Sequence, residues 1–183
     1  MSLGAVVVLA GRRVDAAEAE APRFPARNLA AVEERICELL KESDARVLVC
    51  AAACGADILA LEAAGRMGLR RRVVLPYGRE LFRETSVIDR PGDWGARYDR
   101  LLDEIAAQDD LVVLDFDHGD NTTYLATNSA ILDEARNIAG AQQHEVLAAV
   151  VWDGKSRGED DVTAAFRSEA VNRGFRVEDI RTV

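Results

Sequence analysis

The chain has 183 residues, of which 49% are hydrophobic and 30% charged, so we expect one domain with a sizeable core rather than a disordered chain. Its formal net charge of −9 disfavours broad nucleic-acid binding, because an acidic surface repels phosphate polymers, but it is compatible with a small anion in one basic pocket. Three cysteines are too few for a disulfide scaffold, and no apolar run approaches the length of a membrane span, so we expect a cytoplasmic protein without membrane contacts.

Short apolar runs alternate with helical patterns along the whole chain. The runs predict strands at residues 5–10, 46–51, 71–76, 110–116, 145–152 and 175–180. Helical periodicity predicts helices at 28–43, 56–68, 94–108, 122–142 and 161–174, with an irregular stretch at 77–93. Continuously apolar strands are typical of a parallel sheet that is buried on both faces. The predicted fold class is therefore a three-layer, doubly wound, Rossmann-like α/β domain that spans residues 1–183.

The first predicted strand is followed by a connection from Gly11 to Asn28, which is long for a strand-to-helix loop. A glycine lets a ligand approach the backbone at Gly11, and Arg12 and Arg13 offer guanidinium donors for a phosphate. In a doubly wound sheet, ligands bind beyond the carboxyl ends of the strands. We therefore expect these three residues to contribute to a binding site.

The second predicted strand leads into the sequence AAACGAD, from Ala51 to Asp57, which allows two interpretations. In the first, the turn at Ala53, Gly55 and Ala56 exposes helix N-terminal amides that bind an anion. In the second, the turn is only a tight connection, and Asp57 caps its own helix. Cys54 stands at the same helix start, where a thiol pKa tends to fall, although a small buried cysteine is the simpler interpretation.

Further candidates follow the third and fourth predicted strands. Arg83 and Ser86 lie after the third strand, and Arg97 opens the next predicted helix with a side chain free to point at the cleft. The carboxylates after the fourth strand, such as Asp115, lack the partners and spacing of a metal site, so we expect no metal and no cofactor.

Three spaced motifs, GRRVDA, AAACGADIL and LPYGRELFRETSV, resemble the SLOG superfamily. These are Rossmann-like domains related to the DNA-processing protein DprA and to the Lonely Guy and lysine-decarboxylase-like proteins. The motifs are most similar to a bacterial branch that accompanies nucleotide-cyclase-like or tetratricopeptide-repeat signalling proteins. Arg12 stands where a histidine is common in that branch.

The resemblance implies that a nucleotide or a nucleotide-derived small molecule binds at the strand ends. It places Gly11 and Arg13 beside the ligand, Ala53, Gly55 and Asp57 around its phosphate or ribose, and Arg83 and Ser86 at the side. The family's late Gly-Gly-Thr phosphate loop corresponds here to DDVTAA, which keeps Thr163 but puts Asp160 and Asp161 in place of the glycines. This change disfavours a polyphosphate and Lonely Guy-type phosphoribohydrolase activity.

The function that we expect is ligand binding in a sensory or signalling module, with homo-oligomerisation compatible with the fold. The alternative is an N-glycoside hydrolase or transferase that acts on a nucleotide, with Asp57 as base or nucleophile and Glu62 or Asp115 behind it. Binding of single-stranded DNA is a third possibility, and the net charge of −9 argues against it.

Overall fold

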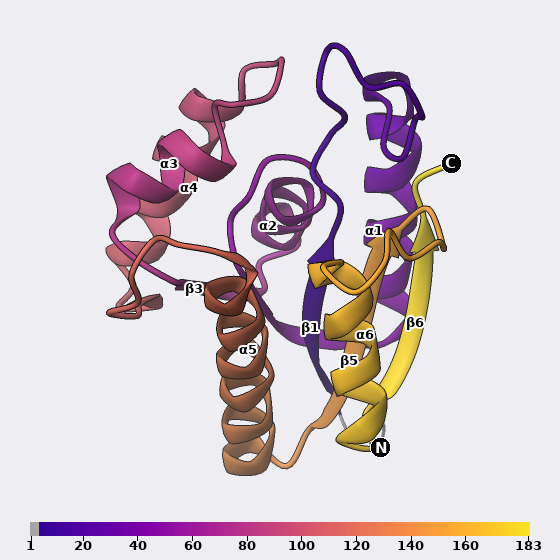
Figure 1. Cartoon of the computed structure of the whole chain (residues 1–183). Helices are drawn as coiled ribbons and strands as arrows, with labels where there is room; N and C mark the ends of the chain where they lie inside the picture. The colour runs from indigo at the N-terminus through magenta and orange to yellow at the C-terminus, as the bar shows by residue number, and fades with distance from the viewer. Residues whose placement is uncertain (1–3) are drawn as a thin grey trace.

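The computed structural model describes residues 4–183, which form a six-stranded sheet and six α-helices (Figure 1). The strands are β1 (Ala5–Gly11), β2 (Ala45–Cys50), β3 (Arg70–Leu75), β4 (Leu111–Val113), β5 (Glu145–Trp152) and β6 (Arg176–Arg181). The helices are α1 (Leu29–Glu42), α2 (Ala56–Arg66), α3 (Arg79–Ser86), α4 (Trp94–Ala106), α5 (Asn121–Gln142) and α6 (Val162–Asn172), and a 3₁₀ turn, η1 (Ala26–Asn28), precedes α1.

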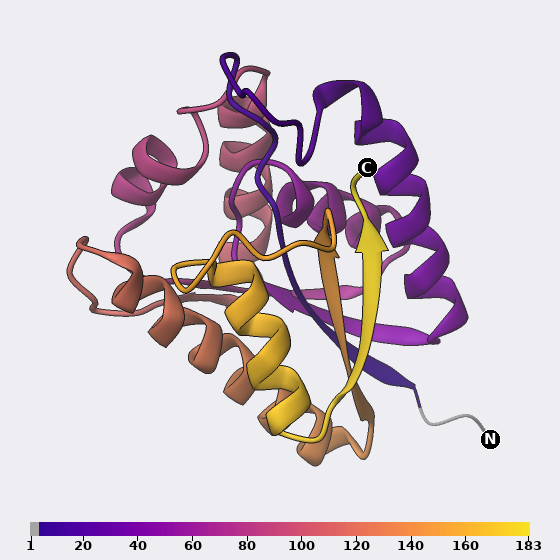
Figure 2. The ribbon, with the colours of Figure 1, turned by 45° about the vertical axis from the view of Figure 1, so that its right-hand side comes forward.

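Every neighbouring pair of strands in the sheet is parallel, and the strand order is β4-β3-β2-β1-β5-β6. The order reverses at β1, because the chain adds β2 to β4 on one side of it and β5 and β6 on the other. Figure 2 shows α5 and α6 together on one face of the sheet and α1 and α2 on the opposite face. The three-layer, doubly wound, Rossmann-like fold predicted from the sequence is therefore confirmed.

Each strand buries alternate residues in two separate cores. In β1, Val7 and Leu9 pack with α1, α2 and α4, whereas Val6 and Val8 pack with α5 and α6. This two-sided burial explains why the strands are continuously apolar, since successive side chains point to opposite faces of a sheet. Of the helices within residues 4–183, none combines the length and the apolar character that a bilayer span requires.

The predicted irregular stretch at 77–93 is wrong in its first half, because it contains the helix α3. This helix buries Phe82 and Ser86, which lie four residues apart and therefore on one helical face. Phe82 stacks on Tyr98 of α4 with ring centroids 6.2 Å apart. A single large apolar residue on the buried face is too sparse a pattern for hydrophobic periodicity to reveal a helix.

The fourth strand is shorter than predicted, because regular pairing covers only Leu111–Val113. The chain still runs beside β3 after this point. The N–H of Leu114 donates to the carbonyl of Leu75 at 2.8 Å, and that of Phe116 donates to the carbonyl of Pro76 at 3.0 Å. Since Pro76 has no N–H to return, the regular ladder ends where β3 ends.

The loop after β1 lies directly on the turn before α2. Gly55 has a φ of 100°, and a Cβ added there would lie 2.7 Å from the nitrogen of Val14 and 2.8 Å from the carbonyl oxygen of Arg12. The N–H of Ala56 donates to that same Arg12 oxygen at 3.2 Å. Glycine is therefore required at position 55 both by its dihedral angle and by the backbone that crosses it.

We expect Gly55→Ala to destabilise the fold by more than about 2 kcal/mol, because a strained φ and a backbone clash act together. Gly68→Ala is the matched control. Gly68 also has a positive φ, 71°, but nothing lies within 4 Å of an added Cβ, so this substitution should cost about 1 kcal/mol. Urea denaturation measures the free energy of unfolding of both variants. Equal losses of stability would show that the loop after β1 moves aside at little cost.

Candidate functional site

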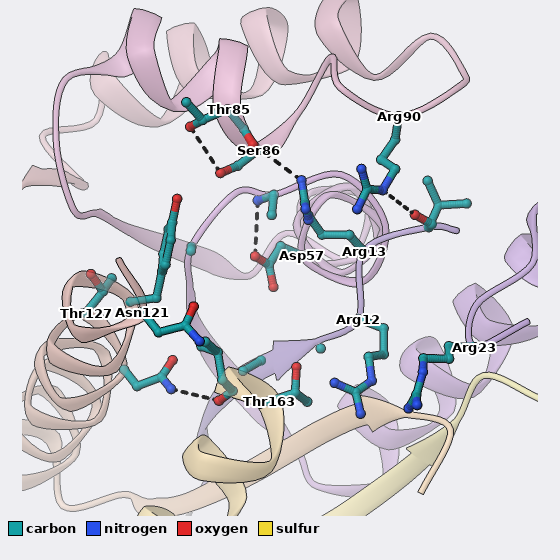
Figure 3. Close-up of a pocket in the computed structure, with 18 of the residues that line it drawn as sticks. Arg12, Arg13, Arg23, Asp57, Thr85, Ser86, Arg90, Asn121, Thr127 and Thr163 are labelled. Atoms are coloured by element: carbon teal, nitrogen blue, oxygen red, sulfur yellow. Dashed lines mark hydrogen bonds between the residues drawn. The ribbon is translucent and has the colours of Figure 1, made fainter. Parts of the chain in front are cut away.

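A cavity of about 440 Å³ opens at the carboxyl ends of β1, β2 and β3 (Figure 3). Residues of the first loop, the turn before α2, α3, and the starts of α5 and α6 line it. This location is the crevice beside the reversal of strand order, where open α/β sheets bind ligands. The volume lies in the range of pockets that take small molecules and cofactors.

Many of the site residues predicted from the sequence line this cavity, because each of these residues follows a strand. Those that line it are Gly11, Arg12, Arg13, Ala53, Asp57, Ser86 and Thr163. Arg90, Tyr124, Asn128 and Arg157 also line the cavity, but they were not predicted from the sequence. These residues lie in loops and helix starts whose direction only the tertiary structure fixes, and no short motif marks them.

Gly55 and Ala56 serve the packing of the chain rather than the cavity wall. The amide of Ala56 is already bound to the Arg12 carbonyl, so the prediction that this turn offers free amides to an anion is wrong for that amide. A Cβ on Gly11 would lie 2.5 Å from the Cβ of Ala56, so Gly11 also allows α2 to approach β1 closely.

Cys54 is fully buried and lies outside the cavity lining. Its backbone N–H donates to the carbonyl of Ser86 at 3.0 Å, which ties the turn to the end of α3. Burial raises the pKa of the Cys54 thiol to about 11, so the lowering expected at a helix start does not occur.

Asp57 contributes a carboxyl group to the floor of the cavity (Figure 3). Its Oδ2 accepts the backbone N–H of Ala53 at 3.1 Å, so it braces the turn before the helix instead of capping α2 as the second interpretation holds. The residue is 7% exposed, and burial raises the pKa of this carboxyl to about 7.

Arg12 is the centre of a buried ion-pair cluster rather than a free donor for a ligand. Its guanidinium donates to Asp153 at 3.1 Å, to both oxygens of Asp161 at 2.6 and 2.8 Å, and to the carbonyl of Lys155 at 2.7 Å. These bonds use every nitrogen of the guanidinium, although the side chain borders the cavity. The pairing joins the loop after β1 to the loop after β5.

Asp161 caps the N-terminus of α6, because its side chain accepts hydrogen bonds from the N–H groups of Thr163 and Ala164, both at 3.1 Å. Burial alone would raise the pKa of Asp161, but hydrogen bonds from Arg12 and from the backbone of Arg157 hold it well below its usual range. Asp120 closes α5 in the same way, through the N–H of Thr122. A phosphate therefore cannot use the ends of these two helices as it would a glycine-rich loop.

Guanidinium groups gather at one side of the cavity. Arg13 and Arg90 share the carboxylate of Asp89, at 2.6 and 3.0 Å. Arg23 pairs with Asp153 at 3.0 Å. The opposite side presents amide and hydroxyl groups, including those of Asn121 and Thr127 (Figure 3).

Arg157 is the least engaged arginine of the group. Its Nε lies 3.7 Å from an Asp161 oxygen, and its guanidinium donates no hydrogen bond to any residue from 4 to 183. Burial, followed by repulsion from Arg12, lowers the pKa of Arg157 below its ordinary value, and Arg23 and Arg13 add to that repulsion. The site thus holds a cation in surroundings that disfavour its charge, which an anionic ligand would relieve.

Arg83 and Arg97 lie away from the cavity, which corrects their expected role. Arg83 donates to both oxygens of Asp99, and Arg97 donates to Glu62 at 2.6 and 3.0 Å. Arg97 also stacks over the ring of Trp94, 4.4 Å from its centroid. These partners on α2 and α4 turn both guanidinium groups toward the outer helices.

The second carboxylates predicted for the enzyme alternative, Glu62 and Asp115, do not lie in the cavity with Asp57. Glu62 binds Arg97 and Arg100, and neither Glu62 nor Asp115 lines the cavity. Within residues 4–183, no three His, Cys, Asp or Glu side chains are grouped so as to hold a metal ion. The described carboxylates that face the cavity are Asp15 and Asp57.

The parallel sheet and the pocket at its carboxyl edge define a Rossmann-like α/β protein with room for a small ligand. No family model and no curated protein matches the chain. Two solved structures are similar to it, both of DNA processing protein A (DprA). The protein from Streptococcus pneumoniae has 18% sequence identity and a TM-score of 0.47, with 96% of this chain and 58% of that chain covered.

The DprA from Helicobacter pylori has 17% sequence identity and a TM-score of 0.44, with 97% of this chain and 76% of that chain covered. This chain thus spans 58% of the length of the first of these structures. The sequence motifs resemble the superfamily to which DprA is related. The similarity between this chain and the two solved structures concerns the fold alone.

We expect Arg12→Ala to destabilise the protein by about 3 kcal/mol, because it removes the main cation of two buried aspartates and leaves Asp153 with Arg23 alone and Asp161 with the 3.7 Å contact to Arg157. Arg46→Ala is the matched control. Arg46 pairs with Asp44 at an exposed position, where such a pair contributes less than about 1 kcal/mol. Urea denaturation at pH 7 measures both, and losses of the same size would contradict the assigned role of Arg12.

We expect Asp57→Asn to stabilise the protein at high pH. The ordinary pKa of the carboxyl is 3.8 and its folded pKa about 7, so between these values the folded chain binds more protons than the unfolded one. Stability therefore falls as the pH rises from about 4 to about 7, and the amide removes a penalty of up to about 4 kcal/mol above that range. Thermal melts at pH 4.5 and pH 8 measure the effect.

Asp110→Asn is the control for this prediction and should have the opposite sign. Burial alone would raise the pKa of Asp110, but hydrogen bonds from Arg70 and Arg72 lower it below its ordinary value. Its replacement should lower the melting temperature more at pH 8 than at low pH. A destabilising Asp57→Asn at pH 8 would contradict the assignment of a costly buried charge.

Proposed function

We propose that the cavity binds a nucleotide or a nucleotide-derived small molecule, with its phosphate at the arginine side and the remainder along the hydroxyl and amide side. The observation that carries this proposal is the charge of the arginine cluster. Five arginines, Arg12, Arg13, Arg23, Arg90 and Arg157, share three aspartates, Asp89, Asp153 and Asp161. These ion pairs therefore contain two more positive than negative charges, in a chain whose net charge is −9.

The arrangement of donors supports recognition by side chains. Asp120 and Asp161 cap the N-termini of α5 and α6, so the guanidinium groups are the charged donors that the cavity offers to a phosphate. Guanidinium forks bind phosphate oxygens in pairs, and the half-exposed Arg157 has the freest one. The neutral side chains opposite, such as Asn128 and Tyr124, suit a sugar and a base.

The wider role that we propose is that of a sensory or signalling module, as in the bacterial SLOG branch that the motifs resemble. In this proposal residues 1–183 act as one domain, and the protein works in the cytoplasm. A binding role is favoured over N-glycoside hydrolysis or transfer, because Asp57 has no second carboxylate placed to assist it: the remaining carboxylate in the cavity wall, Asp15, accepts the backbone N–H groups of Arg23 and Phe24.

Single-stranded DNA is a further ligand to test, since it is the ligand named for the Helicobacter pylori DprA structure. The net charge of −9 argues against it here, because such binding depends on neutralising many phosphates. A short oligonucleotide at low salt therefore belongs in the ligand panel.

We expect a thermal-shift and calorimetry panel of nucleoside monophosphates, cyclic nucleotides, dinucleotides and nucleotide sugars to yield a ligand that raises the melting temperature. Arg157→Gln should weaken its binding about 10- to 100-fold, the effect of losing a charged hydrogen bond. Arg46→Gln, at the opposite end of β2, should leave the affinity unchanged. Equal affinities in all three proteins would place the ligand elsewhere.

Chromatography of the same mixtures tests the enzyme alternative. Release of a free base from a nucleotide by the wild type, but not by Asp57→Asn, would establish glycosidic cleavage. Binding of the oligonucleotide without binding of any small nucleotide would overturn the proposed function in favour of DNA.

A further inference from the structure

Asp57 differs from the paired aspartates around the cavity because it has no cationic partner. Asp89, Asp153 and Asp161 each pair with arginine, whereas Asp57 forms no ion pair with any residue from 4 to 183. Asp15, the other carboxylate of the cavity wall, accepts hydrogen bonds from two backbone N–H groups. Asp57 accepts one, at Oδ2, and its side chain faces the cavity (Figure 3).

The groups around Asp57 leave it as the carboxyl that titrates near neutral pH. Burial raises the pKa of Cys50 well above its ordinary value and that of Cys54 to about 11, so both thiols stay protonated. The other carboxylate of the cavity wall, Asp15, forms no ion pair either, but the backbone N–H groups of Arg23 and Phe24 both donate to it. The charge of Asp57 acts on the thiols of Cys50 in β2 and Cys54 in the turn. The other ionisable groups that line the same cavity are Arg12, Arg13, Asp15, Arg23, Arg90, Tyr124 and Arg157.

We infer that Asp57 is a specificity-determining residue that receives the ligand as a neutral carboxylic acid, so that an anion binding in the cavity takes up a proton. This inference rests on the proposed function. An anion held by the arginines enters the same 440 Å³ cavity as the Asp57 carboxyl. Two negative charges in a largely buried space repel each other, and protonation of Asp57 removes that repulsion.

Protonation also changes what Asp57 recognises. A carboxylate only accepts hydrogen bonds, whereas the neutral acid donates one from its O–H. The site would then favour a ligand that presents an oxygen acceptor to Asp57 and disfavour one that presents an amine. Through linkage, a ligand that takes up a proton binds more tightly at low pH.

The pKa of the Asp57 carboxyl sets the direction and the pH range of the change in ligand affinity. Burial raises the pKa of Asp57 to about 7 in the unliganded protein, and a bound anion raises it further. Affinity should therefore be constant well below pH 7 and should weaken above it, by at most about tenfold per pH unit for one proton.

Isothermal titration calorimetry with 3′,5′-cyclic AMP between pH 5.5 and 9 tests the inference. The phosphodiester of this probe stays singly charged over that range, so the probe adds no titration of its own. In the wild type we expect the affinity to fall about tenfold or more between pH 7 and pH 9. Asp57→Asn keeps a carbonyl oxygen for the N–H of Ala53 and stays neutral, so its affinity should be flat and should exceed that of the wild type at pH 9.

Titrations of the wild type in two buffers of different ionisation enthalpy count the protons directly and do not depend on the variant. Net proton uptake near pH 8 is the expected result. Proton release, no proton exchange, or the same pH slope in Asp57→Asn would overturn the inference.

Sulfate, a dianion at all these pH values, separates the two proposals. If sulfate binds with proton uptake while no nucleotide binds, the proposed function is wrong and the role of Asp57 is supported. If cyclic AMP binds without a proton, the proposed function is supported and the inference is wrong. If neither probe nor any nucleotide of the panel binds at any pH, both are overturned.

Discussion

The structure of the site depends on the close approach of one backbone segment to another. The loop after β1 crosses the turn before α2, where Gly55 leaves no room for a side chain and the Arg12 carbonyl receives the amide of Ala56. This contact fixes the direction in which Arg12 and Arg13 leave the strand. Arg12 is thereby directed to the loop after β5, and Arg13 to the segment that follows α3.

The same geometry explains how an acidic protein can hold a basic pocket. The aspartates near the strand ends neutralise helix termini and arginines, and they are shared between more cations than they can balance. In the sequence, Asp161 argues against phosphate binding. In the structure, its charge is bound by Arg12 and by backbone N–H groups. The ion pairs beside the cavity therefore carry a surplus of positive charge, although the whole chain is acidic.

The fold is predictable from the sequence because its signal is local and repeated. The apolar strands and their alternation with helices predict a parallel sheet, and the residues just after each strand must meet at one edge. This logic brought Gly11, Arg13, Asp57 and Ser86 together. It did not reveal α3, whose buried face offers one large apolar residue.

Side-chain direction is the part of the site that the sequence does not predict. Arg83 and Arg97 follow strands as Arg13 does, yet Asp99 and Glu62 hold them away from the cavity. Conversely, Arg90 and Arg157 reach the cavity from loops without a motif. Which carboxylate an arginine meets depends on contacts between residues far apart in the chain, and no local pattern encodes that choice.

The pairing of Arg12 with Asp153 also bears on the order in which the molecule assembles. The two residues are 141 positions apart, and β1 lies between β2 and β5 in the sheet. During synthesis, β1 can pair with β2 early, but its other edge stays open until most of the chain has emerged. Long-range parallel pairing of this kind is slow and leaves a strand edge exposed to other chains. The cavity is thus among the last parts of the protein to form, and nascent chains should need protection at β1 until β5 arrives.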